Sequence, residues 1–287
     1  MQYCALLCEA ITQLTAADIE EARLDAEILL AEARGLSRAS LRAHLDDPVD
    51  PETANLFNQF VARRAQHEPV AYILNRKEFY GLEFIIDRRA LIPRPETELL
   101  VEQALERLSR RQKADGVQPL VIDVGTGSGA IAIALVKNCP SPLTLIAVDV
   151  SPAALALARA NAQKHHVADH IQFVQTDLLA NVEASADLIV ANLPYISAEE
   201  WRALAPDITD YEPYLALNGG ADGLEAFRRF FASAPAHLAP GGVILLEIGW
   251  KQSNAVRALA RTAFPRALTH VLQDGAGLDR VVVMQTP

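Results

Sequence analysis

The feature that most constrains the fold is a regular alternation of strands and helices that begins at Leu120. Short apolar runs of strand length recur along the chain, with helical stretches between most of them. The predicted strands are 120–124, 144–149, 170–176, 186–191, 242–248, 268–272 and 279–285. This alternation favours an α/β fold with a mostly parallel sheet covered on both faces. Only the short turn DGAG joins the last two strands, so we expect that pair to be antiparallel.

The residues before this alternation are predicted to be helical. DIEEARLDAEILLAEARG indicates a helix that stops at Gly35, and PETANLFNQFVARRAQHEP indicates another that starts at its proline. The apolar faces predicted for these helices are formed by Leu24, Ile28 and Leu29, and by Leu56, Phe60 and Val61. We therefore expect a small helical bundle over residues 1–75, a hairpin or linker over 76–98, and a larger domain over 99–287.

Two motifs shape the expected linker. FYGLEF predicts a hairpin or an extended bridge around Gly81. PRPETE predicts a rigid loop, because each proline disfavours the helical conformation for the residue before it. We expect Glu96 or Thr97 to lie near the start of the helix that follows.

The composition narrows the class of function. The 287 residues are 51% hydrophobic, so a substantial core can form, and the net charge of −10 disfavours non-specific binding to nucleic acid or to an anionic membrane. Three cysteines suit a reducing cytoplasm, where we expect the protein to be located. We predict no signal peptide, because the N-terminus lacks a basic region followed by an apolar block. We predict no membrane span, because no apolar run reaches about 20 residues. No metal site is expected, because Cys4 and Cys8 have no partner ligands at suitable spacing.

A glycine-rich turn follows the first strand of the predicted sheet. In LVIDVGTGSGAIAIAL, the strand leads into Gly125, Gly127 and Gly129, with Thr126 and Ser128 between them, and then into a helix. Glycines allow a ligand to approach the backbone closely, and we expect the turn to present N–H groups to that ligand. By itself, such a turn can also be only a tight joint between a strand and a helix.

An acidic residue ends the second predicted strand. TLIAVDVSP places Asp149 twenty residues after Gly129, where its carboxylate can accept hydrogen bonds from both hydroxyls of a ribose. The strand, the glycine turn, the helix and this acid together predict a site for a nucleoside cofactor.

The spacing of the glycines separates two classes of cofactor. Dinucleotide sites prefer G-x-G-x-x-G, whereas this turn is G-x-G-x-G followed by Ala130. S-adenosylmethionine has no phosphate to seat, so we expect it as the cofactor, with S-adenosylhomocysteine as the product. Asp177 and Leu178 follow the third strand and are predicted to lie near the adenine. Asp177 has a second interpretation, as the N-cap of a following helix.

The fourth predicted strand ends in the motif Asn192, Leu193, Pro194 and Tyr195, at the sheet edge where ligands bind. A simple interpretation is a turn, because asparagine and proline are common in turns. The functional interpretation is that the carboxamide oxygen of Asn192 and a backbone carbonyl, that of Leu193, accept the two N–H bonds of a planar nitrogen. Those bonds favour the positive charge that develops on the nitrogen during methyl transfer. Pro194 stiffens the loop, and Tyr195, expected to be exposed, offers a flat face for a planar group.

Three further residues are candidates for the same site. Arg94 and Thr97 are predicted to border the substrate or the cofactor. Glu247 ends a strand on the cofactor edge, with a site role and a structural role both open. GGADGLEAF reads as a turn and a helix start, without a chemical role.

The chain resembles the peptide chain release factor glutamine methyltransferases over nearly its whole length. The motifs that carry the resemblance are EPVAYILNRKEFYGLEF, LIPRPETELLVE, DVGTGSGAIAIAL, AVDVSPAALALARANA, DLIVANLPYI, YEPYLALNGGADGLEAFRRF, APGGVILLEIGWKQ and GLDRVVV. The resemblance implies a seven-stranded Rossmann-like methyltransferase sheet preceded by the helical domain.

The resemblance also implies a reaction. S-adenosylmethionine donates a methyl group to the side-chain nitrogen of the glutamine in the Gly-Gly-Gln motif of bacterial class 1 release factors, and residues 1–75 help to hold the release factor. By motif position, residues 125–129 and Asp149 bind the cofactor, while Asn192 to Tyr195 bind the substrate amide. We expect no direct binding of nucleic acid, and a monomeric protein.

One position departs from the family pattern. The family motif is usually Asn-Pro-Pro-Tyr, and here Leu193 stands where the first proline would be. Dimethyladenosine rRNA methyltransferases often carry Asn-Leu-Pro-Tyr, although the acidic composition and the IPRPETE block argue against an rRNA enzyme. The alternatives are N6-adenine methylation of nucleic acid, an NAD-dependent dehydrogenase, and a non-catalytic protein that keeps the cofactor pocket.

Overall fold

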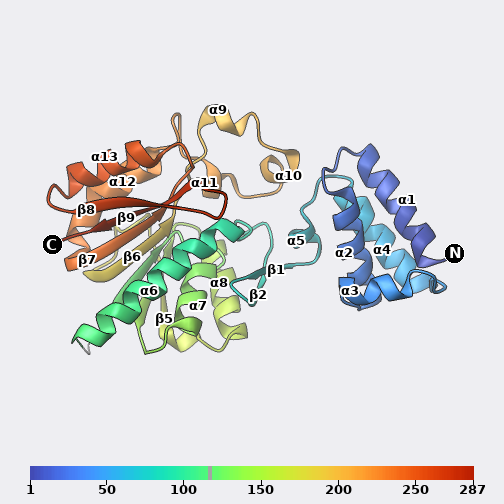
Figure 1. Cartoon of the computed structure of the whole chain (residues 1–287), viewed down its shortest axis with the longest axis horizontal. Helices are drawn as coiled ribbons and strands as arrows, with labels where there is room; N and C mark the ends of the chain where they lie inside the picture. Colours follow the sequence, from blue (N-terminus) through green and yellow to red (C-terminus); the bar gives the residue numbers. More distant parts are fainter. Residues whose placement is uncertain (116–117) are drawn as a thin grey trace. The chain divides into compact units, whose positions relative to one another are not determined.

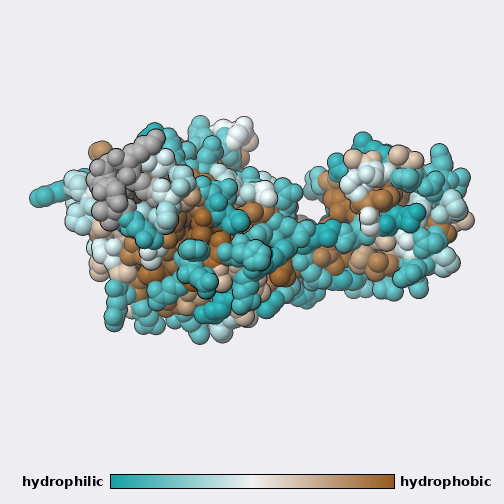
Figure 2. All heavy atoms as spheres, turned by 90° about the horizontal axis from the view of Figure 1, so that it is seen from below, coloured by the Kyte–Doolittle hydropathy of each residue, from teal (hydrophilic) through white to brown (hydrophobic). Residues whose placement is uncertain are grey.

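The computed structural model describes residues 1–115 and 118–287, and the described chain divides into two compact units (Figure 1). The helical unit comprises residues 1–76 and 205–211, and the α/β unit comprises residues 77–204 and 212–287. The predicted boundaries place residues 205–211 in the larger domain, whereas in the structure these residues pack with the helices. Hydrophilic residues cover most of the surface seen in Figure 2, with hydrophobic residues visible between them.

The helical unit is built from short helices. They are α1 (Tyr3–Ala16), α2 (Ala22–Arg34), α3 (Arg38–Leu41), a 3-10 helix (Arg42–His44), α4 (Pro51–Arg64), α5 (Val70–Ile73) and α10 (Pro206–Thr209). Gly35 ends α2 in the left-handed conformation, as predicted, with a φ of 69°. The Asp50 side chain caps α4 by accepting a hydrogen bond from the Thr53 N–H at 2.8 Å.

The apolar faces of these helices differ in part from the predicted ones. In α2, Leu29 is fully buried, but Leu24 and Ile28 are only partly buried. In α4, Leu56 is 38% exposed, and the neighbouring Phe57 is fully buried in its place. Helical periodicity therefore identified the helices correctly. In α4 the predicted Val61 is buried, and only Leu56 was chosen in place of its neighbour Phe57.

The segment 205–211 is held to the helical unit by polar contacts. Arg64 forms a buried ion pair with Asp25, at 2.6 Å between Nε and Oδ2, and a longer one with Asp207, at 3.8 Å. The Tyr211 hydroxyl donates to the Gln66 carbonyl oxygen at 2.7 Å. These contacts explain why the segment belongs to this unit although most of the unit lies more than a hundred residues earlier in the sequence.

The α/β unit begins with a two-stranded hairpin. Strands β1 (Arg76–Phe79) and β2 (Leu82–Ile85) are joined by Tyr80 and Gly81. Both residues have a positive φ angle, 52° for Tyr80 and 70° for Gly81. Two consecutive positive φ angles are typical of the type I′ turn, whose twist matches that of the strands it joins. The hairpin expected around Gly81 is confirmed.

The main sheet has seven strands in the order β5-β4-β3-β6-β7-β9-β8. Their bounds are β3 Leu120–Val124, β4 Thr144–Asp149, β5 Ile171–Gln175, β6 Ala186–Asn192, β7 Leu238–Glu247, β8 Leu268–Gln273 and β9 Asp279–Gln285. All seven predicted strands are present, and β7 begins four residues earlier than predicted. Strands β3 to β7 pair in parallel, and β9 pairs antiparallel with both β7 and β8, which confirms the expected last pair.

Helices cover the sheet in two groups (Figure 1). Helix α7 contacts both α6 and α8, and these three helices contact strands β4 to β7. Helix α12 packs against α13, which contacts β8 and β9. The helices of this unit are α6 (Glu98–Asp115), α7 (Ala130–Asn138), α8 (Pro152–Lys164), α9 (Ala198–Trp201), α11 (Tyr214–Leu217), α12 (Glu225–Ser233) and α13 (Ser253–Ala263), with 3-10 turns at Pro95–Thr97, Ala168–His170 and Ala234–Ala236. Among the described residues, no helix is long and apolar enough to span a membrane.

Candidate active site

Most of the predicted site residues line one cavity of about 490 Å³ at the carboxyl ends of β3, β4 and β6. This volume lies within the range of small-molecule sites. The predicted residues in its wall are Arg94, Thr97, Gly125, Thr126, Gly127, Ser128, Asp149, Asp177, Leu178, Asn192, Leu193 and Pro194. Of the predicted set, Gly129 and Tyr195 are not in the wall.

The glycine turn uses its own N–H groups to bind neighbouring strands and loops. The N–H groups of Gly125 and Thr126 both donate to the Val148 carbonyl oxygen at 2.9 Å. The Gly127 N–H donates to Asp149 Oδ2, also at 2.9 Å. This differs from the expectation that the turn presents these donors to a ligand. A turn whose donors are already satisfied suits a ligand that has no phosphate to bind.

Gly129 has a packing role. Its φ of 81° lies in the left-handed region, and a Cβ atom there would approach Ile133 Cδ1 to 3.1 Å and Ala158 Cβ to 3.2 Å. Glycine therefore allows α7 to begin close against α8, which places the turn at the cavity without Gly129 itself reaching the wall.

Asp149 projects two acceptor atoms at the end of β4. Its Oδ2 accepts the Gly127 N–H, and its Oδ1 accepts the Ser151 N–H at 2.9 Å. Each carboxylate oxygen has a second lone pair, so two further donors can be accepted from the cavity. Burial raises the pKa of Asp149, and these backbone hydrogen bonds oppose that rise.

Asp123 is a buried acid that is not among the predicted site residues. It is fully buried, and burial raises its pKa to about 7. The Thr126 hydroxyl donates to its Oδ2 at 2.6 Å, so that hydroxyl is used within the protein. The available signal was an ionisable residue inside an otherwise apolar strand, immediately before the glycine turn.

Asn192 is the last residue of β6, and in the sheet it lies beside Glu247, the last residue of β7. The Asn192 Nδ2 donates to Thr97 Oγ1 at 3.3 Å, and Thr97 Oγ1 donates to Glu247 Oε2 at 2.6 Å. Thr97 is 5% exposed and Glu247 is 1% exposed. The structure thus joins three residues that are far apart in the sequence into one chain of hydrogen bonds.

The residues after Asn192 differ in how they pack. Leu193 is 2% exposed and belongs to the main hydrophobic core, where its Cδ2 lies near Gly125. Tyr195 is not the exposed phenol expected from the sequence, because it is partly buried against the same core. Burial, with a smaller contribution from the charge of Glu247, raises the pKa of the Tyr195 hydroxyl.

The block GGADGLEAF, which had no assigned role, holds the loop after Asn192. The Gln252 Nε2 donates to the Tyr195 carbonyl oxygen at 3.0 Å and to the Gly223 carbonyl oxygen at 3.1 Å. A backbone hydrogen bond of 2.8 Å from Gly219 to Ile196 ties the same loop to this block. A Cβ at Gly223 would lie 2.4 Å from the Tyr195 carbonyl oxygen, so only glycine fits.

Replacing Gly223 with alanine is therefore expected to destabilise the fold by at least about 2 kcal/mol, from backbone strain and overpacking together. We also expect kcat to fall, because the displaced carbonyl belongs to the Asn192 loop. Urea denaturation measures the first effect. Gly277→Ala is the matched control, since Gly277 has a similar φ of 78° but no atom within 4 Å of the Cβ position. Equal losses in the two variants would contradict the steric explanation.

Arg94 lies at the wall of the cavity in an ion pair. Its guanidinium pairs with Glu212, whose side chain is 2% exposed. Glu212 also accepts the Ile92 N–H at 3.0 Å. Glu212 therefore ties the loop before α6, which carries the IPRPETE block, to the YEP block.

Asp177 lies at the rim of the cavity and forms an ion pair with Arg229. Both side chains are about half exposed. The alternative interpretation of Asp177 as a helix cap is wrong, because the next residues form turns and the next helix starts at Ala198.

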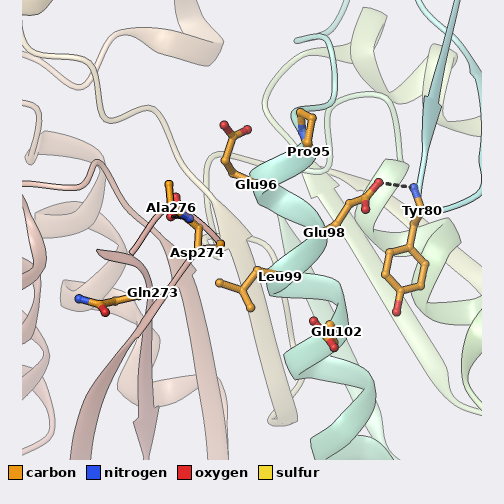
Figure 3. Close-up of a pocket in the computed structure, with 10 residues that line it drawn as sticks. Tyr80, Pro95, Glu96, Glu98, Leu99, Glu102, Gln273, Asp274 and Ala276 are labelled. Atoms are coloured by element: carbon orange, nitrogen blue, oxygen red, sulfur yellow. Dashed lines mark hydrogen bonds between the residues drawn. The ribbon is translucent and has the colours of Figure 1, made fainter. Parts of the chain in front are cut away.

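A second cavity lies beside the start of α6 (Figure 3). Glu96, Glu98 and Glu102 project from one side of it and Asp274 from the other, and Glu98 accepts the Tyr80 N–H at 2.8 Å. It contains none of the predicted site residues. Among the described residues, no group of three or more His, Cys, Asp or Glu side chains is arranged to hold a metal ion.

The sheet order and the Asn192 cavity define a methyltransferase with a Rossmann-like fold. Residues 97–208 match the family model described as "Methyltransferase small domain". A methyltransferase from Pyrococcus furiosus has a TM-score of 0.55 at 17% identity and covers 78% of this chain and 97% of its own. The hMettl16 catalytic domain, in complex with MAT2A 3′UTR hairpin 6, has a TM-score of 0.57 at 17% identity. The match covers 79% of this chain and 81% of that domain's chain. At this identity the two structures support the fold alone.

The chain belongs to the family of release factor glutamine methyltransferases. Residues 5–74 match the model described as "PrmC N-terminal domain". The release factor glutamine methyltransferase of Cereibacter sphaeroides is 43% identical over 280 residues, which are 97% of this chain and 96% of that protein. The one from Xylella fastidiosa (strain Temecula1) is 42% identical over 278 residues, 96% and 98% of the two chains.

Proposed function

We propose that the protein transfers a methyl group from S-adenosylmethionine to the side-chain amide nitrogen of the glutamine in the Gly-Gly-Gln motif of class 1 peptide chain release factors. The observation that supports this most directly is the position of Asn192. Its carboxamide lines the same cavity as Asp149 and the glycine turn, so an acceptor amide and a nucleoside can meet there.

The cavity fits S-adenosylmethionine better than a dinucleotide. The N–H groups of Gly125, Thr126 and Gly127 are taken up by the protein, and Asp149 keeps two acceptor positions for ribose hydroxyls. Much of the remaining wall is apolar, including Ile131, which suits an adenine ring. When bound, the cofactor supplies an electrophilic methyl group on a sulfonium. The NAD-dependent dehydrogenase is therefore the weaker alternative.

The chain's own residues position the acceptor nitrogen. The amide nitrogen of glutamine is a poor nucleophile, because its lone pair is delocalised into the carbonyl. In the proposed complex the Asn192 carboxamide oxygen and the Leu193 carbonyl oxygen accept its two N–H bonds, and Pro194 stiffens the loop between them and Tyr195. These acceptors stabilise positive charge as it develops on the nitrogen, and orientation supplies the rest of the acceleration. Once methylated, the nitrogen is acidic and releases one of its two protons to water, so no strong base is needed.

The remaining parts of the proposal concern the partner. The helical domain, residues 1–75, holds the release factor, and the protein acts in the cytoplasm as a monomer without binding nucleic acid directly. The net charge of −10 supports the last point, because nucleic-acid binding depends on basic surface.

Labelled S-adenosylmethionine tests the reaction. The protein is incubated with a class 1 release factor, with the same release factor carrying glutamate in place of the motif glutamine, and with ribosomal RNA. We expect label only in the unmodified release factor, one added methyl group in its intact mass, and that group on the motif glutamine after fragmentation. Label in the glutamate variant or only in RNA would contradict the proposal.

A further inference from the structure

We infer that Thr97 and Glu247 are positioning residues that fix the orientation of the Asn192 carboxamide, with its nitrogen toward the protein and its oxygen toward the acceptor amide. This inference rests on the proposed function, because it concerns the same methyl transfer. Neither residue has to contact the substrate to act in this way. Their role follows from the single hydroxyl proton of Thr97, because that proton can be donated to only one neighbour.

A threonine hydroxyl has one proton, and in this structure that proton is used. Thr97 Oγ1 lies 2.6 Å from Glu247 Oε2, and an ionised carboxylate can only accept. The Thr97 hydroxyl therefore donates to Glu247 and has only lone pairs left for Asn192. A lone pair can be satisfied only by the NH₂ group of the carboxamide, which matches the 3.3 Å contact from Asn192 Nδ2.

The orientation matters because a carboxamide has two different ends. With Nδ2 bound to Thr97, the oxygen is the end that remains for the cavity, where an N–H donor of the substrate amide needs an acceptor. The reversed carboxamide would face that amide with its own N–H bonds and would not stabilise positive charge on the acceptor nitrogen.

The backbone supports the same arrangement. Asn192 and Glu247 are register partners at the ends of the parallel strands β6 and β7. Thr97 is held on the other side by the 3-10 turn Pro95–Thr97, in which its N–H donates to the Arg94 carbonyl oxygen at 3.1 Å. Two strands and one rigid turn thus set the three side chains, so little movement is needed for the network to form.

The network also predicts a pH dependence. Burial raises the pKa of Glu247 to about 7. Hydrogen bonds from Thr97 and from Asn192 and the charge of Arg280 oppose that rise, and the charge of Glu96 adds to it. Tyr195 also faces this carboxylate, and its hydroxyl stays neutral because its pKa is raised. A protonated Glu247 can itself donate to Thr97, which frees the threonine proton to point at the carboxamide. The orientation is then no longer fixed, so kcat should fall as the pH drops through about 7.

Thr97 variants test the hydrogen-bond chain. Thr97→Val keeps the shape but removes the hydroxyl, and we expect kcat to fall about 10- to 100-fold with KM for S-adenosylmethionine changed by less than about 3-fold. Thr97→Ser keeps the hydroxyl and should restore most of the lost kcat. Thr262→Val, at an exposed position on α13, is the matched control. A serine variant as slow as the valine variant would overturn the inference.

A Glu247→Gln variant tests the direction of donation in the hydrogen bonds that join Glu247, Thr97 and Asn192. Its neutral amide can also donate to Thr97, so it does not fix the direction of the Thr97 hydroxyl proton. We therefore expect kcat to fall about 10- to 100-fold, and the decrease of kcat below about pH 7 to disappear.

The same variant should not lower the stability of the fold. Because the folded pKa of Glu247 lies above its unfolded value, the ionised form destabilises the fold at pH 8, and the variant should be at least as stable there as the unsubstituted protein. Glu102→Gln, an exposed change on α6, is the control.

The possible outcomes separate this inference from the proposed function. If the unsubstituted protein methylates release factor but Thr97→Val and Glu247→Gln keep kcat within about 2-fold, the inference is wrong and the function stands. If kcat of the Glu247→Gln variant still decreases below about pH 7 as in the unsubstituted protein, the inference is also wrong. If the unsubstituted protein transfers no methyl group, the proposed function itself fails. Should Glu247→Gln not fold, the threonine pair still decides the question.

Discussion

Asn192→Ala is expected to lower kcat for release factor methylation about 10²- to 10³-fold, the range found when one hydrogen bond specific to the transition state is removed. The alanine leaves the acceptor amide without its side-chain partner, while the backbone carbonyl of Leu193 remains. KM for S-adenosylmethionine should change little, because the proposed ribose acceptor is Asp149. Steady-state kinetics with saturating release factor measure both parameters.

The control for this variant is Asn254→Ala, which removes a carboxamide from an exposed position on α13. It should leave kcat and thermal stability unchanged. An Asn192→Ala enzyme with the rate of the control would remove Asn192 from the mechanism. A lower rate accompanied by a large loss of stability would instead point to a structural role.

Asp149→Ala is expected to weaken binding of S-adenosylmethionine about 100-fold. The change would remove the two charge-assisted hydrogen bonds proposed between Asp149 and the ribose, and a net loss of about 3 kcal/mol corresponds to a factor of about 10² in Kd. It also leaves the N–H groups of Gly127 and Ser151 without their acceptor, so the glycine turn loses an anchor. Isothermal titration calorimetry with S-adenosylhomocysteine measures the affinity directly.

The kinetic pattern of this variant should be the reverse of that for Asn192→Ala. At saturating S-adenosylmethionine, kcat should recover to within about 10-fold of the original value, because the proposed role of Asp149 is to bind the ribose and not the acceptor nitrogen. Asp169→Ala, an exposed carboxylate, is the matched control. An unchanged Kd in Asp149→Ala would mean that the ribose is bound elsewhere.

The central strands β3, β4, β6 and β7 were predictable because most of their residues are buried, whereas the outer strands β5 and β8 are partly exposed. Each central strand reads as a short apolar run bounded by turn residues, and a parallel sheet permits few arrangements of such runs. The short DGAG connection fixed the direction of the last pair in the same way. The glycine turn, Asp149 and Asn192 were found because each stands where a predicted strand ends.

Other features depend on contacts that a single sequence does not contain. Glu247 was noticed at the end of its strand, but only the register between β6 and β7 puts it next to Asn192. The role of Gly223 depends on the loop of Tyr195 packing against it. Leu56 and Phe57 are both apolar, so the pattern could not tell which of them faces the core until the helix was packed.

The chain passes three times between the two units, after residues 76, 204 and 211. The helical unit is therefore not a separable N-terminal module, even though nearly all of it is encoded first. A fragment beginning at residue 77 would keep Asp207 and Tyr211 but lose Arg64 and Gln66, their partners. Any exchange of this unit between related enzymes has to graft residues 205–211 together with the amino-terminal helices, so two distant places in the gene would have to change together for the unit to keep its contacts.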